Sequence, residues 1–236
     1  MYPKRESLDR SWTPGFKMSD PDGVGGESPP VMLEASRYPD KAALRRALRA
    51  ARAAVGREER GIAAAKLVRH ALRQRLLARK RRVGFYMASK NEIDIGLLLA
   101  RAKCMGVDCY LPVVPGRGHR KLWFVRLGNR PAWVLNRYGI PEYQHPPARK
   151  VRAYQLDVLF MPLLGFDAKG WRVGMGGGYY DASLAKLATR RRWRTPHLIG
   201  VAFAAQEVDR IPHDPWDIPL DGVLTERGFL SVRRNQ

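Results

Sequence analysis

The chain has 236 residues, and its 43 Lys and Arg against 22 Asp and Glu give a formal charge of +21 at pH 7. This length, with a hydrophobic fraction of 45%, suits one α/β domain with a substantial core. Two cysteines, Cys104 and Cys109, exclude a disulfide framework, and no apolar run is long enough for a membrane span. No apolar segment follows the first six residues as in a secretory signal, so we expect a cytoplasmic protein.

The positive charge has two interpretations. It attracts polyanions such as RNA or steers small anionic substrates, or it is a solvated, arginine-rich surface. We favour the second, because the charges fall on predicted helix faces and do not alternate with aromatic residues. We therefore predict that the protein does not act by binding nucleic acid and that its charge assists anionic small molecules. We also predict a monomer.

Residues 1–38 are rich in Pro, Gly, Ser and Asp, and cannot bury enough apolar surface to offset their ordering entropy. They predict a flexible N-terminal extension, followed by a single domain over 39–236. Asp40 is a good N-cap for a helix that begins at Lys41, and a second helix is predicted over 57–80.

A strand over 83–87, a helix over 93–104 and a strand over 108–114 follow one another. This βαβ order predicts an α/β fold of three layers, α/β/α, with a largely parallel sheet. Ligands in such folds gather at the carboxyl ends of the strands, where residues 89–94 fall.

Further along the chain, residues 121–127 alternate as a strand does and are expected to pair with 132–135. Residues 143–153 resemble an exposed loop. The remaining predicted elements are a buried strand over 157–166, a helix after Asp181, and strands over 197–203 and 223–225.

The most informative stretch is the glycine-rich run before that helix, which holds Gly174, Gly176, Gly177 and Gly178. Without Cβ atoms these residues can adopt positive φ and turn N–H groups toward an anion at the start of a helix. Arg172 adds a fork of donors suited to phosphate. Asp181 would be repelled by phosphate unless a cation such as Mg²⁺ lay between them. The alternative is a tight turn that binds nothing.

The run Arg172-x-Gly174-x-Gly176-x-Gly178-Tyr179-Tyr180-Asp181, preceded by Pro162-Leu-Leu-Gly-Phe166-Asp167, resembles the signature of the 5-formyltetrahydrofolate cyclo-ligase family, also called 5,10-methenyltetrahydrofolate synthetase. Three further segments fall in the family's order and spacing, so the resemblance covers about Lys41 to Leu230. They are Lys41-Ala-Ala-Leu44-Arg45, Asn91-Glu92-Ile-Asp94 and Asp217-Ile-Pro-Leu-Asp221.

The resemblance implies a ligase of one-carbon metabolism that uses ATP and Mg²⁺ to convert 5-formyltetrahydrofolate to 5,10-methenyltetrahydrofolate, with release of ADP and phosphate. The implied reaction passes through a phosphorylated formyl (N-iminium phosphate) intermediate. The folate substrate can carry a polyglutamate tail. It implies catalytic roles for Lys41, Arg45, Arg172 and Tyr179, folate contacts from Met87, Glu92, Tyr138 and Tyr179, and metal ligands in Asp181 and Asp217. The implied ATP-binding residues are Lys41, Ala42, Ala43, Leu44, Arg45, Arg172, Val173, Gly174, Met175, Gly176, Gly177, Gly178, Tyr179 and Tyr180.

Two departures from the family pattern bear on the site. Some members carry Lys or Arg between the glycines, where this chain has Met175 and Gly177, so phosphate recognition should rest more on the other cations. Tyr138 stands where some members have Trp, and a smaller ring still stacks on a flat heterocycle. Of the histidines, His70 is predicted to be structural, and His213 to lie in a turn or at the surface.

Two other functions stay open. The first is an RNA-binding module with a vestigial site, against which Arg172, Asp181 and Asp217 speak. The second is a different enzyme on a related sheet, such as a sugar-phosphate isomerase or a kinase, which its substrate would distinguish.

Overall fold

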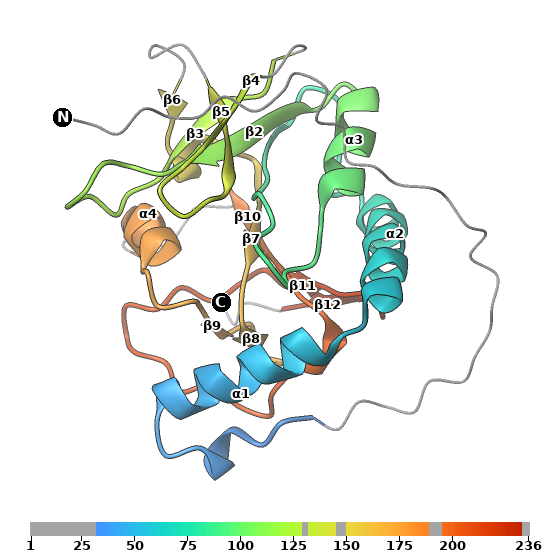
Figure 1. Cartoon of the computed structure of the whole chain (residues 1–236). Helices are drawn as coiled ribbons and strands as arrows, with labels where there is room; N and C mark the ends of the chain where they lie inside the picture. Colours follow the sequence, from blue (N-terminus) through green and yellow to red (C-terminus); the bar gives the residue numbers. More distant parts are fainter. Residues whose placement is uncertain (1–31, 129–131, 145–149, 189–194, 233–236) are drawn as a thin grey trace.

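In the computed structural model, which describes residues 32–128, 132–144, 150–188 and 195–232, eight strands form a central sheet in the order β12-β11-β10-β7-β1-β2-β3-β6 (Figure 1). Neighbours from β11 to β2 pair parallel, and the pairs β11–β12, β2–β3 and β3–β6 are antiparallel. The prediction of a largely parallel sheet is confirmed. The strands are β1 Arg82–Gly84, β2 Asp108–Val113, β3 Trp123–Arg126, β6 Lys150–Val151, β7 Val158–Pro162, β10 His197–Val201, β11 Gly222–Leu224 and β12 Phe229–Ser231.

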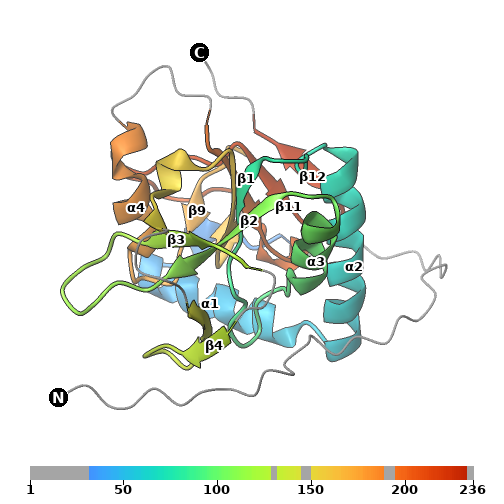
Figure 2. The ribbon, with the colours of Figure 1, turned by 90° about the horizontal axis from the view of Figure 1, so that it is seen from above.

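Helices cover both faces of this sheet, which confirms the three layers (Figures 1 and 2). Leu67 of α2 and Leu98 of α3 join a core cluster on one face, and Leu184 of α4 joins the cluster on the other. Burying such side chains contributes about 1.5–3 kcal/mol each. The helices are α1 Lys41–Ala54, α2 Arg57–Arg73, α3 Gly96–Cys104 and α4 Tyr179–Ala188, with short 3₁₀ turns η1 Ala35–Arg37, η2 Ala153–Gln155 and η3 Ala204–Gln206.

The first helix, α1, lies across one end of the sheet (Figure 1). Asp40 caps it, because its Oδ1 accepts a hydrogen bond from the Ala43 amide at 2.7 Å, as the sequence predicted. Leu44 and Leu48 pack in a third cluster with residues that follow the carboxyl ends of β7 and β10, including Leu164 and Val208. The helix is therefore fixed where an α/β fold binds ligands.

Two helix boundaries differ from the prediction. α2 ends at Arg73 and not near residue 80, because the chain reverses at Arg75, whose φ is 51°, and buries Leu76 and Leu77. α3 begins at Gly96 and not at Ile93, which is buried before the helix starts.

The pairing of the middle strands also differs. The hairpin predicted between 121–127 and 132–135 is wrong, because β3 pairs with β2 and β6. The second segment forms β4 (Ala132–Leu135), which pairs with β5 (Pro141–Gln144). The predicted loop over 143–153 contributes β6, and residues 145–149 lie outside the described residues. The predicted 157–166 strand divides into β7 and β8 (Gly165–Phe166), which pairs with β9 (Arg172–Val173).

The described residues of the predicted N-terminal extension contact the domain. Leu33 forms a β-bridge with Val208, and the Ala35 amide donates to Asp209 Oδ1 at 2.6 Å. Residues 1–31 lie outside the described residues, so the prediction for them is untested. In the described part of the chain, no helix has the length and apolar character that crossing a membrane requires.

Candidate active site

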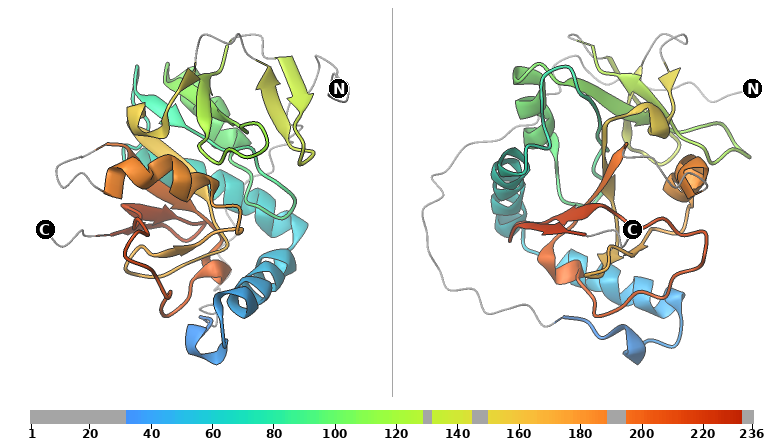
Figure 3. Two further views of the ribbon diagram at one scale, coloured as in Figure 1. Left: turned by 90° about the vertical axis from the view of Figure 1, so that its left-hand side faces the viewer. Right: turned by 180° about the vertical axis from the view of Figure 1, so that it is seen from behind.

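Three separate stretches of the chain meet at one cavity of about 80 Å³. They are the first turns of α1, the stretch from Trp171 through β9 to Gly174 together with Asp181 of α4, and the loop that precedes β11 (Figure 3). The predicted site residues in its lining include Lys41, Arg45, Arg172, Gly174, Asp181 and Asp217. The fold thus brings together side chains that are up to 176 positions apart, counted from Lys41 to Asp217.

Both predicted metal ligands lie next to a cation. The Arg172 guanidinium, whose side chain is 8% exposed, forms an ion pair with Asp181 and donates to the Ile218 carbonyl. Lys41 Nζ lies 2.9 Å from Asp214 Oδ2 and 4.0 Å from Asp217 Oδ2. The cavity is therefore lined by opposite charges in close pairs.

Two carboxylates line this cavity, those of Asp181 and Asp217. The described residues contain no group of three or more His, Cys, Asp or Glu that could hold a metal ion. Mg²⁺ in nucleotide sites needs only one or two carboxylates, with the remaining ligands from phosphate and water. Asp181 and Asp217 line the same cavity and match that requirement.

The glycine-rich loop uses its glycines in different ways. Gly176 and Gly178 have φ of 102° and 64°, as predicted for positions that need positive φ. Gly174 and Gly177 do not have positive φ, so the prediction is wrong for them. A Cβ on Gly177 would lie 3.0 Å from the Tyr179 ring, so this glycine permits close packing.

The predicted nucleotide-binding residues on α1 divide into two groups. Arg45 points to the loop and donates its Nε–H to the Gly174 carbonyl at 3.2 Å. Ala43 and Leu44 are buried, and their amides donate to Asp40 within the helix cap. Ala42 is exposed. A role for the three apolar residues in binding ATP is untested.

Two of the predicted folate-contacting residues form a pair. The hydroxyl groups of Tyr138 and Tyr179 lie 2.6 Å apart, with ring centroids at 6.3 Å and an interplanar angle of 78°. Arg137 donates to the Tyr179 hydroxyl at 2.6 Å. The hydrogen bond with Tyr179 lowers the pKa of the Tyr138 hydroxyl. The pair forms an exposed aromatic edge beside the glycine-rich loop, since Tyr138 is 55% exposed.

Glu92, the predicted acceptor for the pterin, lies just before α3, and its side chain is 8% exposed. Its Oε2 accepts from the Ser89 amide at 2.8 Å, and its Oε1 lies 3.5 Å from Arg52 Nη1. Burial raises the pKa of Tyr86 and of Tyr180, and the charge of Glu92 adds to both shifts. Both phenols therefore stay protonated at neutral pH. Met87, also predicted, is partly buried and packs against the core.

A family model described as the 5-formyltetrahydrofolate cyclo-ligase family matches residues 37–226 of the chain. The chain belongs to the 5-formyltetrahydrofolate cyclo-ligase family. The chain is 31% identical to the Haemophilus influenzae cyclo-ligase over 160 residues, which are 67% of this chain and 82% of the relative. It is 34% identical to the Escherichia coli K12 cyclo-ligase over 147 residues, 61% and 76% of the two chains.

Solved structures agree with this assignment. The Aquifex aeolicus 5,10-methenyltetrahydrofolate synthetase matches with a TM-score of 0.69 and 26% identity, over 83% of this chain and 94% of that one. The Mycoplasma pneumoniae synthetase matches with a TM-score of 0.60, over 79% and 99% of the two chains. Its 22% identity supports the fold alone. The chain is thus an enzyme of the family that converts 5-formyltetrahydrofolate to methenyltetrahydrofolate.

The sequence analysis assigned no role to Asp167, whose carboxylate links two segments that line the small cavity. This carboxylate is 1% exposed. Its Oδ1 accepts from the amides of Lys169 and Trp171, and its Oδ2 from Ile211, at 2.9–3.0 Å. Trp171 also stacks on His213 at 3.7 Å between centroids. These contacts join the β8–β9 hairpin to the loop that carries Asp217, and His213 is exposed, as predicted, with its ring against Trp171. The signal that the sequence offered for Asp167 was its position in the motif that runs from Pro162 to Asp181.

A second, larger cavity of about 1020 Å³ also escaped prediction. It lies beside α4, because Ala182 is in its lining. Cationic side chains dominate its charge, and Arg152 lies over the Trp123 ring, 3.2 Å from its centroid. These cations are Arg120, Lys121, Lys150 and Arg152. They come from separate loops and strands, so no local sequence pattern marks them.

Proposed function

We propose that the chain converts 5-formyltetrahydrofolate to 5,10-methenyltetrahydrofolate at the expense of ATP, through a phosphorylated formyl group. The observation that carries the proposal is the cavity at which Lys41, Arg45, Arg172, Asp181 and Asp217 converge from three separate stretches. A cavity with three cations and two carboxylates suits a metal-bound polyphosphate.

A formyl amide is a poor electrophile with a poor leaving group, and phosphorylation corrects both. The formyl oxygen attacks the γ-phosphorus in line, and the bond to the ADP oxygen breaks. The resulting N-iminium phosphate carbon accepts the electron pair of N10. N10 loses its proton, the C–O bond breaks, and inorganic phosphate departs. The product carries the methenyl bridge between N5 and N10.

In this proposal, Lys41, Arg45 and Arg172 bind the triphosphate together with the loop from Val173 to Tyr180, and orient its terminal phosphorus. Asp181 and Asp217 would hold Mg²⁺, which would neutralise charge on the phosphates. Arg172 and Lys41 already contact acids of this site, so binding exchanges their partners.

Tyr138 and Tyr179 would stack on the folate, with Met87 beside it. Glu92 would accept hydrogen bonds from donors on the pterin ring. The large cavity beside α4 supports a place for the anionic glutamate tail, because Arg120, one of its cations, lies near Gly178 at the end of the glycine-rich loop. Its volume lies at the upper end of the usual range for ligand sites.

One assay tests the proposal. Purified protein is mixed with Mg-ATP and 5-formyltetrahydrofolate, and the absorbance of the methenyl product is followed. We expect product growth that requires both ATP and Mg²⁺, with one ADP released per product. Product without ATP, or turnover of a sugar phosphate instead, would refute it. RNA affinity without folate turnover would favour the binding-module alternative. Cytoplasmic location and a monomeric state stay predictions.

A further inference from the structure

α1 carries a row of cations that continues beyond the two that the sequence predicted. Lys41, Arg45, Arg49 and Arg52 are spaced by four, four and three positions, which places them on one side of the helix. Arg45 donates to the Gly174 carbonyl, and Arg49 Nη2 donates to the Met175 carbonyl at 3.4 Å. The row therefore follows the glycine-rich loop along its first residues.

The last member of this row, Arg52, is buried, and its guanidinium group has few hydrogen-bond partners. The residue is 4% exposed. Its Nε and Nη1 are buried and make no hydrogen bond of normal geometry among the described residues, although Nη1 forms an ion pair with Glu92 Oε1 at 3.5 Å. Its Nη2 donates only to the sulfur of Met175, at 3.9 Å. A buried cation whose donors lack hydrogen bonds costs free energy, and a single long ion pair with Glu92 offsets only part of that cost.

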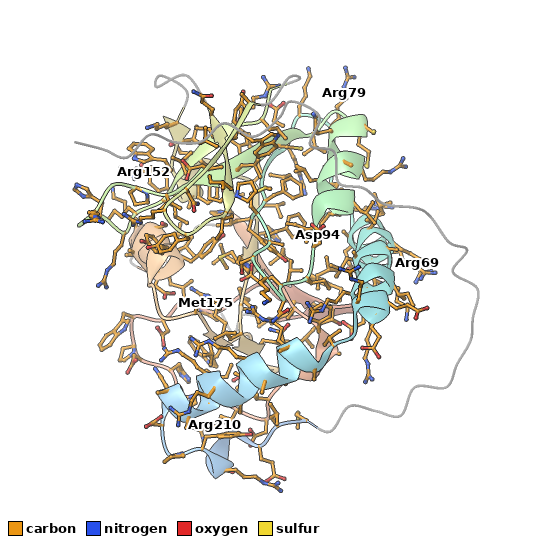
Figure 4. All side chains as sticks on the ribbon, in the orientation of Figure 1. Arg69, Arg79, Asp94, Arg152, Met175 and Arg210 are labelled. Atoms are coloured by element: carbon orange, nitrogen blue, oxygen red, sulfur yellow. The ribbon has the colours of Figure 1, made fainter. Side chains whose placement is uncertain are left out.

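The surroundings of Arg52 show what it could bind. On one side lies Glu92, 3.5 Å away, the residue proposed to contact the pterin. On the other lies Met175 of the loop proposed to hold phosphate, which is seen just above α1 in Figure 4. Arg52 thus lies where the two substrates of the proposed reaction would meet. Met175 is 45% exposed, and its flexible thioether is a weak acceptor that a phosphoryl oxygen would readily replace.

We propose that Arg52 is a substrate-contacting residue that binds the terminal phosphoryl group of the nucleotide when Met175 moves aside. This inference rests on the proposed function. Through Arg52, α1 supplies a positive charge that the glycine-rich loop lacks, because Met175 and Gly177 are uncharged. The guanidinium supplies several N–H donors in a fixed fork, which suits the oxygens of the group in transfer.

The first test measures binding. Arg52→Met keeps an apolar stem of similar length and removes the donors. We expect it to weaken binding of a non-hydrolysable ATP analogue about 10- to 100-fold, the size of one charged hydrogen bond, and to leave ADP affinity unchanged. The matched control is Arg46→Met, an exposed arginine of the same helix. A purely structural role for Arg52 predicts equal effects on ADP and the analogue, and either that or no effect would overturn the proposal.

The second test restores the charge from the loop. Arg52→Met should lower kcat about 100-fold with a smaller change in the folate KM, and adding Met175→Arg should recover at least tenfold of it. No recovery, or an Arg52→Met kcat within threefold of the parent, would overturn the proposal. If Arg52→Met fails to fold, Arg52→Lys takes its place in the binding test. Should the parent protein make no methenyl product, the proposed function fails, while the analogue-against-ADP comparison still decides the role of Arg52.

Discussion

Asp167→Asn is the most direct test of how the site is held together. The native carboxylate accepts three backbone N–H bonds, from Lys169, Trp171 and Ile211. An amide of the same shape keeps one accepting oxygen. If that oxygen retains the two bonds on the hairpin side, the NH₂ group faces the Ile211 amide, and a donor then meets a donor in a buried site.

The magnitude follows from the bonds that change. A hydrogen bond to a charged acceptor contributes about 1.5–3 kcal/mol, and one is lost outright while two lose their ionic character. We expect a loss of about 2–4 kcal/mol in the free energy of unfolding. For a domain of this size, that lowers Tm by roughly 5–15 °C.

Thermal and urea unfolding of both proteins provide the measurement. The matched control is Asp209→Asn, the same chemical change at a carboxylate that accepts one exposed bond, from Ala35. Since Ile211 precedes the loop that carries Asp217, turnover of folded Asp167→Asn should also require more Mg²⁺. A stability within about 0.5 kcal/mol of the parent, or a loss equal to that of the control, would show that Asp167 does not join the two segments.

Three further variants test single roles. Arg172→Ala should lower kcat/KM by about 100-fold or more, and near-normal turnover would refute its phosphate contact. Asp217→Asn should raise the Mg²⁺ concentration for half-maximal rate about tenfold while Tm changes little, whereas an unchanged Mg²⁺ curve would exclude it as a ligand. In an ultraviolet titration, Tyr138 should ionise below the usual tyrosine pKa, because the hydrogen bond with Tyr179 favours its anion; Tyr138→Phe should remove that step, and its persistence would contradict the assignment.

Much of the fold could be predicted because the signals are local. Asp40 marks the start of α1 by its side-chain chemistry, and the βαβ order between 83 and 114 dictates parallel pairing. The end of α2 was mispredicted because helical periodicity continues past Arg73, while burial of Leu76 and Leu77 requires the chain to turn. The partners of β3 depend on distant segments, which an alternating pattern cannot identify.

The candidate site likewise has a part that the sequence predicted and a part that it did not. Its motif residues were recognisable because family resemblance preserves residue order, and the structure shows that seven of them share a cavity. Arg52 and Arg49 were missed because one arginine on an arginine-rich helix looks like another until the opposite surface is known. The cations of the large cavity were missed for the same reason, since folding alone brings residues 120 and 152 together.

The ion pairs of Arg172 with Asp181 and of Lys41 with Asp214 have a consequence for the affinity of this cavity for anions. If the proposed nucleotide binds there, it would displace internal counter-charges, so the electrostatic gain would be the difference between two attractions. Under the proposed function, discrimination between anions would come from geometry. Inorganic phosphate would disrupt the same ion pairs with fewer contacts in return, whereas a chelated nucleotide would replace both pairs at once. The large positive charge of the protein would accelerate encounter, while the internal acids would keep loosely matched anions from remaining bound.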